Sequence, residues 1–342
     1  DPARDGKFRT VEVRVNRPGL EVRTRSGYDA PRDAPADRPK PPASPLMKAL
    51  AGVIPKSDLP MQITGPAFAY AGEVTADKPA ADDTAPSTEE QKKADKKKKD
   101  KDKKDAPKPV ASVLLAVGFR QPIRQSDERA VENVDLQVSA FDPDGPSYGN
   151  FHQRADVTIR PGSSGEAEYE VFGQINLKPG RYQLRIAANL ASFADSGSVY
   201  YDIDVPDFVN DPLSMSGILL SSTPNPQYAP KNGLKPTVPI IPTTRRVFTP
   251  QYAGSVFARV YQGGKAKPVA VTVRMRIRDE KDAIVIERKQ DLPASLFSST
   301  RATDLQLEVP MKELTTGAYL LTIETSNGTS TVRRDSRFSI AK

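Results

Sequence analysis

Two ten-residue stretches decide the fold of this chain: LKPGRYQLRI at positions 177–186 and LTTGAYLLTI at positions 314–323. Both follow the pattern Leu-x-x-Gly-x-Tyr-x-Leu-x-Ile. In such a pattern the glycine supplies a turn, the tyrosine opens a strand, and the leucine and isoleucine alternate toward one face. Each stretch therefore predicts a tight turn followed by a half-buried β-strand.

The tyrosine of this pattern has a specific structural role. Its hydroxyl can bond back to the loop before the strand, as in the tyrosine corner of immunoglobulin-like sandwiches. The sequence thus predicts four structural, tyrosine-corner-like residues: Gly180, Tyr182, Gly317 and Tyr319.

The two stretches also indicate an internal repeat. An offset of 137 residues, without gaps, places Tyr201 on Phe338 and Ile203 on Ile340. This match favours duplication of one domain, the alternative being two unrelated β-domains that share turn chemistry.

Strand-like patterns surround both stretches, and helical periodicity is nearly absent. Seven strands are expected before Pro206: 59–71, 110–119, 131–141, 148–160, 167–176, 181–189 and 198–205. Seven more are expected after it: 213–222, 255–262, 269–278, 283–291, 302–309, 318–325 and 331–340. The predicted fold class is all-β, with two tandem immunoglobulin/fibronectin-like β-sandwiches at 57–206 and 207–342. The Pro-rich stretch 223–250 should run extended along a sheet edge, where proline is tolerated.

The charge is concentrated outside the predicted sandwiches. The formal net charge is +7, of which residues 89–108 contribute +4 and residues 1–40 contribute +3. The Lys/Asp-rich segment has no aromatic residues, so we expect residues 76–108 to be a disordered insertion between two strands. A nucleic-acid partner would need a basic folded face or interleaved aromatic residues, and none is therefore predicted.

The N-terminal 31 residues read as a separate unit. Apolar residues alternate over 7–25 around a turn at 16–19, which predicts a β-hairpin. A lone hairpin is marginally stable, so we expect it to complete a domain before Asp1, with a signal peptide further upstream. Residues 32–56 are rich in proline and are predicted to be a linker.

These residues also resemble a known family. DGKFR at 5–9, VEVRV at 11–15, RPGL at 17–20 and RSGYDAP at 25–31 resemble the C-terminal end of the VWFA-related domain of acidobacterial-type secreted proteins. Ser214–Ser222 and Arg246–Gly263 resemble the β-rich tail of those proteins. The resemblance implies that residues 1–31 end a von Willebrand factor type A domain. It also implies that the Asp-x-Ser-x-Ser metal motif lies upstream, so no metal site is carried over.

The composition and motifs give little support for catalysis or for a cofactor. The chain has no Cys, no Trp and one His, His152, which we interpret as a surface or strand-edge residue. Gly-x-Ser-x-Gly, P-loop and Gly-x-Gly-x-x-Gly motifs are absent. Asp142-Pro143-Asp144-Gly145 favours a turn over a calcium loop. Interdomain calcium would require residues that we interpret as a solvated face: Asp202, Asp204, Asp207 and Asp211.

The predicted function is that of a non-catalytic structural or interaction tail of a secreted or periplasmic von Willebrand A-type protein. It would dock protein partners of the cell envelope or extracellular space through sandwich faces and edges. No run approaches the roughly 18–20 apolar residues that span a bilayer, so no transmembrane segment is expected. The alternative is a carbohydrate- or peptidoglycan-binding module, whose candidate aromatic residues are Tyr148, Tyr200, Tyr228, Tyr252 and Tyr261.

Overall fold

The structure of the protein is a computed structural model of the whole chain. It describes residues 8–11, 13, 27–30, 44–52, 54–69, 111–122, 130–142, 147–159, 166–192, 196–230, 234, 237–297 and 300–342. The predicted insertion at 76–108 lies outside the described residues.

The N-terminal residues form a small sheet of their own. Strand β1 (Phe8–Thr10) pairs antiparallel with β2 (Gly27–Asp29), so that Phe8 lies opposite Asp29. No third strand joins them among the described residues. The predicted turn at 16–19 lies between the two strands but outside the described residues.

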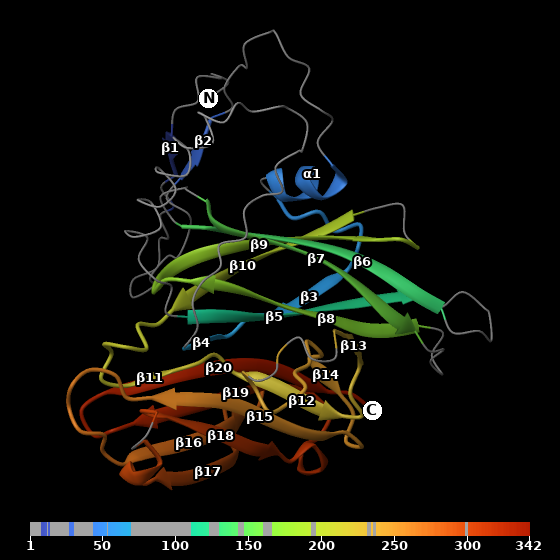
Figure 1. The fold of residues 1–342 in the computed structure, drawn as a ribbon. Coiled ribbons are helices and arrows are strands. Elements are labelled where there is room, and N and C mark those ends of the chain that lie inside the picture. Colours follow the sequence, from blue (N-terminus) through green and yellow to red (C-terminus); the bar gives the residue numbers. More distant parts are fainter. Residues whose placement is uncertain are drawn as a thin grey trace, which may run out of the picture.

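The first sandwich consists of two sheets (Figure 1). Sheet I has the order β10-β9-β6-β7, with β6 (Ala130–Phe141), β7 (Ser147–Ile159), β9 (Gly180–Leu190) and β10 (Ser196–Val205). Sheet II has the order β13-β8-β5-β3, and β4 also pairs with β5. Its strands are β3 (Met61–Thr64), β4 (Ala67–Ala69), β5 (Ala111–Pro122), β8 (Glu166–Leu177) and β13 (Gln227–Ala229).

The second sandwich repeats this arrangement. Sheet III has the order β11-β15-β12, and β18 also pairs with β15. Its strands are β11 (Ser214–Met215), β12 (Leu219–Thr223), β15 (Ala253–Tyr261) and β18 (Ala302–Val309). Sheet IV has the order β14-β20-β19-β16-β17. Its strands are β14 (Val247–Phe248), β16 (Val271–Arg278), β17 (Ile284–Leu292), β19 (Gly317–Ser326) and β20 (Thr331–Ile340). Two short 3₁₀ helices, Ala294–Phe297 and Met311–Glu313, flank β18.

The two sandwiches share one topology. In chain order, β5 to β10 occupy the same sheet positions as β15 to β20, and the split pair β3 and β4 corresponds to β11 and β12. Each sandwich has its own apolar core between its two sheets. The predicted all-β fold of two tandem sandwiches is therefore confirmed.

The gap-free alignment of the repeat is wrong by two residues at its end. Tyr182 lies opposite Ile203, whereas Tyr319 lies opposite Phe338. The structural counterpart of Phe338 is thus Ile203 and not Tyr201. The reason is the hairpin connection, because fewer residues join β19 to β20 than join β9 to β10.

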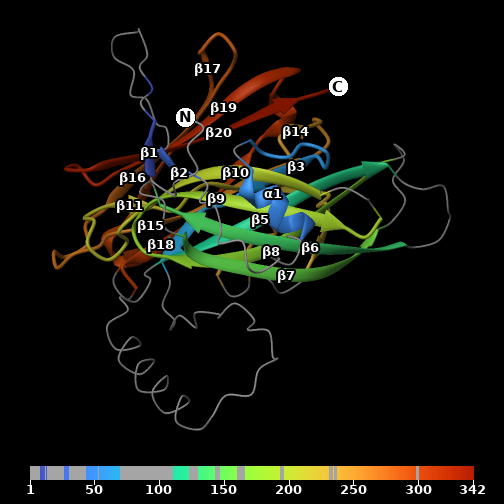
Figure 2. The same ribbon diagram turned by 90° about the horizontal axis from the view of Figure 1, so that it is seen from above.

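A short helix covers the outer face of sheet I (Figure 2). Helix α1 (Pro45–Ala51) begins at Ser44, whose Oγ accepts a hydrogen bond from Met47 N, and proline occupies its first turn. Leu46, Ala49 and Leu50 of the helix pack with Ala187 of β9. The second part of the predicted linker 32–56 is thus attached to the first sandwich.

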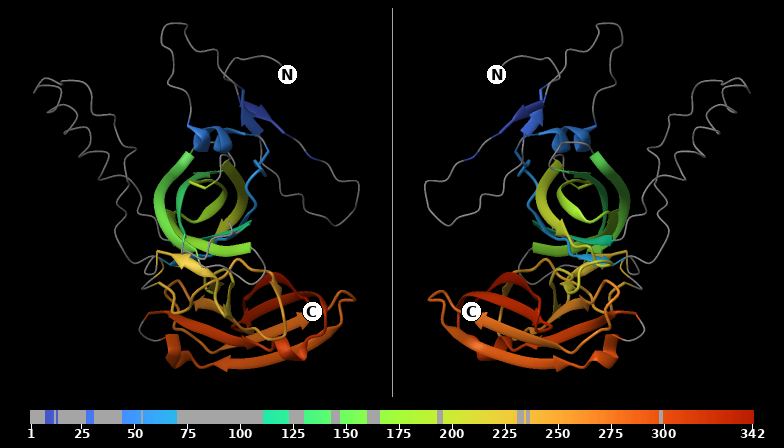
Figure 3. Two further views of the ribbon diagram at one scale, coloured as in Figure 1. Left: turned by 90° about the vertical axis from the view of Figure 1, so that its right-hand side faces the viewer. Right: turned by 90° about the vertical axis from the view of Figure 1, so that its left-hand side faces the viewer.

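The outer faces of sheets II and III pack against each other and form a third apolar cluster, which we call the junction (Figure 3). Its buried members are Phe68, Leu114, Ala116, Phe172, Leu219, Leu234, Val238 and Phe257. Phe68 of β4 stacks on Phe257 of β15 with ring centroids 6.1 Å apart. The junction therefore joins sheet II of the first sandwich to sheet III of the second.

The Pro-rich stretch 223–250 contributes one short strand to each sandwich. Its β13 adds parallel to the β8 edge of sheet II, and its β14 adds parallel to the β20 edge of sheet IV. The expected packing along a sheet edge is confirmed at these two strands, whereas Leu234 and Val238 between them pack into the junction.

Candidate binding site at the junction of the two sandwiches

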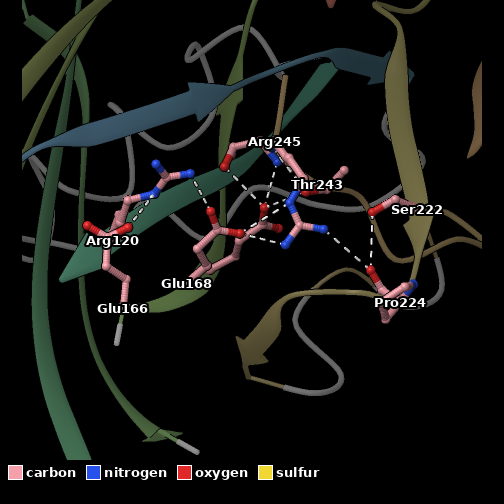
Figure 4. Close-up of polar contacts among 9 residues, drawn as sticks. Arg120, Glu166, Glu168, Ser222, Pro224, Thr243 and Arg245 are labelled. Carbon is pink, nitrogen blue, oxygen red and sulfur yellow. Dashed lines mark hydrogen bonds and ion pairs between the residues drawn. The ribbon is translucent and has the colours of Figure 1, made fainter. Parts of the chain in front are cut away.

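Residues 243–248, which we call the strap, bind both sandwiches. Figure 4 shows Arg245 of the strap between Glu168 of β8 and Pro224 O. Thr243 N donates to Leu220 O of β12 at 2.7 Å, and Ser339 N of β20 donates to Arg246 O at 2.8 Å. The polar side chains at 243–245 turn to the first sandwich, where Glu168 and Glu170 project from the outer face of β8. The strap thus ties an acidic pair of one sandwich to two strands of the other.

Glu170 is the buried member of this pair, with 2% of its surface exposed. Its Oε1 accepts three hydrogen bonds: from Thr244 N at 2.6 Å, from Thr243 Oγ1 at 2.9 Å and from Thr244 Oγ1 at 3.1 Å. Its Oε2 is buried and has no hydrogen-bond partner among the described residues. Burial raises the pKa of Glu170, although the bonds from Thr243 and Thr244 oppose this effect.

Glu168 lies two residues earlier on the same face of β8, and its pKa is shifted in the opposite direction. Arg245 Nη2 and Nε donate to its Oε2 at 2.5 and 3.1 Å, and Arg120 of β5 bonds its Oε1. Burial opposes ionisation of this carboxyl, but the two guanidinium groups outweigh it and hold the pKa of Glu168 below its usual range. Glu168 is therefore a fully paired carboxylate.

The close approach of the strap to sheet II depends on Gly118. This residue of β5 lies opposite Glu170 in the ladder. A Cβ at this position would lie 2.0 Å from Thr244 Oγ1 and 3.1 Å from Thr244 Cβ. A residue without a side chain is required here because the strap crosses directly over the strand.

Arg246 is the remaining cation of the strap. Its Nη1 donates to Thr243 O at 3.1 Å and to Arg245 O at 2.9 Å. Burial lowers the pKa of Arg246, and the nearby Glu170 and Tyr201 oppose this. An arginine stays charged in proteins despite such a shift.

A cavity of about 470 Å³ opens beside these groups. Its polar side chains include Arg120, Glu168, Glu170, Arg245 and Arg246. Its apolar wall comes from β3, β10 and the ends of the Pro-rich stretch, and includes Leu59, Pro60, Met61, Val199, Pro226 and Val247. A volume of this size, with an apolar wall and a few convergent polar groups, has the character of a ligand site.

The predicted tyrosine-corner residues occupy matching positions in the two sandwiches. Gly180 and Gly317 open β9 and β19 with φ of +145° and +157°, which favours glycine. Tyr319 Oη donates to Thr315 O at 2.8 Å, in the loop before its strand. Tyr182 and Tyr319 are equally buried, at 7% exposure. Tyr182 and Tyr319 lie in the sandwich cores, whereas Gly180 is exposed and Gly317 is half-buried. None of the four lines the junction cavity.

His152 lies on β7, on the exposed outer face of sheet I. Its Nε2 is 2.5 Å from Asp135 Oδ1 on the neighbouring strand, and half of its side chain is exposed. The structure places this pair on the opposite side of the first sandwich from the junction.

The acidic residues considered for calcium are not brought together. Asp202 pairs with Gln183, Asp204 with Arg181, and Asp207 accepts hydrogen bonds from Val209 N and Asn210 N. Within the described ranges, no group of three or more His, Cys, Asp or Glu residues could hold a metal ion. Residues 143–146 of the predicted 142–145 turn lie outside the described residues, between the paired strands β6 and β7.

The tyrosines considered for carbohydrate binding have different surroundings. Tyr200 donates to Gly52 O near α1, Tyr228 stacks on Phe172, and Tyr252 packs against Phe248 and under Arg245. Tyr261 is buried against Phe208, and its Oη accepts a hydrogen bond from Ala69 N at 3.1 Å. Tyr148 lies on β7, and its side chain is outside the description. The four described rings therefore do not form one platform.

Sequence reasoning did not identify the junction site. One signal was present: β5 reads ASVLLAVGF at 111–119, a continuous apolar run with both faces buried. Such a run is typical of a strand covered on both sides. The pairing of Glu170 with Thr243 and Thr244 has no comparable signal, because it joins residues more than 70 positions apart.

Comparisons with known proteins do not assign a family. No family model matches the chain, and no curated protein matches it. Among solved structures, a glycosyl hydrolase family 2 member from Bacteroides cellulosilyticus is 12% identical, with a TM-score of 0.26 over 67% of this chain and 28% of that one. Dimeric latent PorU from Porphyromonas gingivalis is 12% identical, with a TM-score of 0.28 over 68% and 18%. Trypsin-activated alpha-2-macroglobulin from Escherichia coli is 15% identical, with a TM-score of 0.21 over 67% and 14%.

This chain thus spans less than a third of each of these three proteins. The scores are too low to transfer an activity. A search of the described helices finds none with the length and apolar character needed to span a membrane.

Proposed function

We propose that this chain is a non-catalytic interaction module, the β-rich tail of a secreted or periplasmic von Willebrand A-type protein, which docks protein partners as one rigid body. The observation that carries the proposal is the junction. An apolar cluster and a hydrogen-bonded strap join the outer faces of sheets II and III. A scaffold that is already ordered loses less conformational entropy when it binds a partner.

The resemblance of residues 5–31 supports membership of the von Willebrand A-type family. Strands β1 and β2 pair only with each other among the described residues, and a two-stranded sheet is marginal by itself. This supports a role for these strands as the end of a larger domain. Export from the cytoplasm is part of the same proposal and has the same support.

Strand β17 offers the edge at which a partner can dock. It lies at the end of sheet IV and pairs only with β16 within the described strands. Two adjacent apolar residues on it, Ile284 and Val285, are 48% and 45% exposed. An exposed strand edge with apolar side chains accepts an added strand from another chain.

The test uses co-sedimentation of the purified chain with an envelope fraction from a bacterium that encodes it. Docking to a protein predicts binding that is lost after the envelope is treated with protease. Val285→Lys should weaken this binding at least about tenfold, because a charge at the edge opposes strand addition. Val131→Lys, at a valine of β6 that is 59% exposed, is the matched control and should bind normally.

Two results would contradict the proposal. Binding that survives protease treatment and is reproduced by purified peptidoglycan would favour the glycan-binding alternative. Equal binding of the two lysine variants would show that the β17 edge is not the docking surface.

A further inference from the structure

The junction cavity contains more positive than negative groups. Three guanidinium groups line it, from Arg120, Arg245 and Arg246, against the two carboxyl groups of Glu168 and Glu170. Arg120 and Arg245 both bond Glu168, and Arg120 also pairs with Glu166, so these two cations already have carboxylate partners. Arg246 and Glu170 are therefore the groups available to a ligand.

Both of these groups can act as donors. Hydrogen bonds of Arg246 to the described residues use Nη1, which leaves Nε and Nη2 for another acceptor. Glu170 accepts three bonds at Oε1, so a proton on this carboxyl is held at Oε2, the atom without a partner in the described part of the chain. A protonated Oε2 is a hydrogen-bond donor, and burial of Glu170 favours that form.

A buried polar atom without a partner carries a free-energy cost that a ligand can remove. A guanidinium group and a carboxylic acid together match an acceptor that is itself negatively charged. The wall formed by Leu59, Met61 and Val199 suits a hydrocarbon group attached to that acceptor.

We propose that the junction cavity binds a carboxylate that carries a small apolar group, with Arg246 and Oε2 of Glu170 as its hydrogen-bond donors. The carboxylate can belong to a free carboxylic acid or to the C-terminus of a peptide. This site is separate from the β17 edge and does not depend on the docking role proposed above.

The chain provides a local probe for this site. It contains five methionines, and Met61 lines the cavity whereas Met275 is buried in the core of the second sandwich. With methyl-labelled methionine, NMR titrations should show a shift of the Met61 resonance on addition of hexanoate and no shift of Met275. Hexanamide, which has the same apolar chain without the charge, should bind at least about tenfold more weakly.

Two peptides distinguish the sources of the carboxylate. N-acetyl-Val-Leu with a free C-terminus is compared with the same peptide as the C-terminal amide. Tighter binding of the free peptide than of hexanoate assigns the site to a chain terminus, and tighter binding of hexanoate assigns it to a small acid. Failure of both carboxylates to shift Met61 would overturn the proposal.

Variants assign the donors and block the cavity. Arg246→Gln should weaken hexanoate binding at least about tenfold, whereas Arg288→Gln, which removes an equal charge from exposed β17, should not. If Arg246→Gln fails to fold, Gln62→Trp tests the location of the site instead. Gln62 is an exposed residue of β3 that lines the cavity, so the larger side chain should block hexanoate binding there. Unchanged hexanoate binding by a folded Gln62→Trp variant would contradict the proposed location.

Discussion

At the scale of single residues, Gly118 determines how closely the strap approaches sheet II. Gly118→Ala places a Cβ 2.0 Å from the hydroxyl of Thr244, a branched side chain with little freedom to move. We expect this substitution to lower the free energy of unfolding by about 1–3 kcal/mol, because overpacking displaces the strap from Glu170.

Gly149→Ala is the matched control for this prediction. It lies in β7, where the new Cβ would meet Ile175 Cδ1 at an ordinary 3.4 Å. Urea unfolding of both variants checks the comparison, and equal stabilities would contradict the account of the strap.

Glu170 makes the stability of the protein depend on pH. Burial raises its pKa above the ordinary 4.5 in the folded state only. The folded protein then binds the proton more tightly than the unfolded chain. The favourable contribution is complete below the unfolded value and is lost as the pH rises through the folded-state pKa.

Glu170→Gln should remove this pH dependence, because an amide does not titrate in this range. We expect the free energy of unfolding of the variant, relative to the native chain, to increase from about pH 4 to about pH 8. Glu168 titrates in both proteins, so its opposite effect cancels in the difference. Urea unfolding at several pH values measures this difference, and a constant value would show that Glu170 does not titrate as proposed.

The hydroxyl of Tyr319 fixes the loop before β19. Tyr319→Phe removes its partly buried hydrogen bond to Thr315 O. We expect a loss of about 1–2 kcal/mol in thermal unfolding experiments. Tyr252→Phe is the control, since Tyr252 contacts Phe248 and Arg245 through its ring. Equal losses in both variants would argue against a specific role for the Tyr319 bond.

Residue identity made some of these features predictable and left others hidden. The positions of Gly317 and Tyr319 follow from local spacing, because a turn and the strand after it are encoded within a few residues. Glu170 is different, since a glutamate at an alternating strand position normally faces solvent. Only the fold brings Thr243 and Thr244 over it, so its burial could not be read from the sequence.

At the scale of elements, β4 and β5 are joined by the long connection that contains the Lys/Asp-rich segment. Their ends are neighbours in the sheet, because Ala69 lies opposite Ala111. Deletion of residues 78–106 therefore leaves enough chain to close the hairpin. We expect a melting temperature unchanged or slightly higher, since each halving of a loop saves about 0.6 kcal/mol of closure entropy. A large drop in differential scanning calorimetry would show that the deleted segment contributes to the folded core.

Elements were predicted well because each strand carries its own periodicity. β16 alternates buried and half-exposed residues along its whole length, as an alternating sequence requires. The register between repeats was less predictable. Tyr201 and Phe338 align in sequence, but the hairpin connections differ in length, and the structural partner of Phe338 is Ile203.

At the scale of the whole molecule, each sandwich has its own core, and the junction is a third apolar cluster that both sandwiches share. Phe68 and Phe257 stack across it, and Leu234 and Val238 of the Pro-rich stretch complete it. Sandwiches in tandem need not pack face to face, and no local pattern specifies which sheets meet. The one sequence signal for this packing was the continuous apolar run of β5, which is buried on both faces. The proposed docking role depends on this junction, because it fixes the β17 edge relative to the first sandwich.

The most direct test of this account measures a distance between sheet I of the first sandwich and sheet IV of the second. The chain has no native cysteine, so spin labels can be attached at Arg154→Cys on β7 and Lys289→Cys on β17, which are both exposed. Pulsed electron paramagnetic resonance should give a single narrow distance distribution, and adding Phe68→Ala should broaden it by weakening the junction. A broad or multiple distribution in the doubly labelled chain with Phe68 intact would contradict the claim that the two sandwiches form one rigid body.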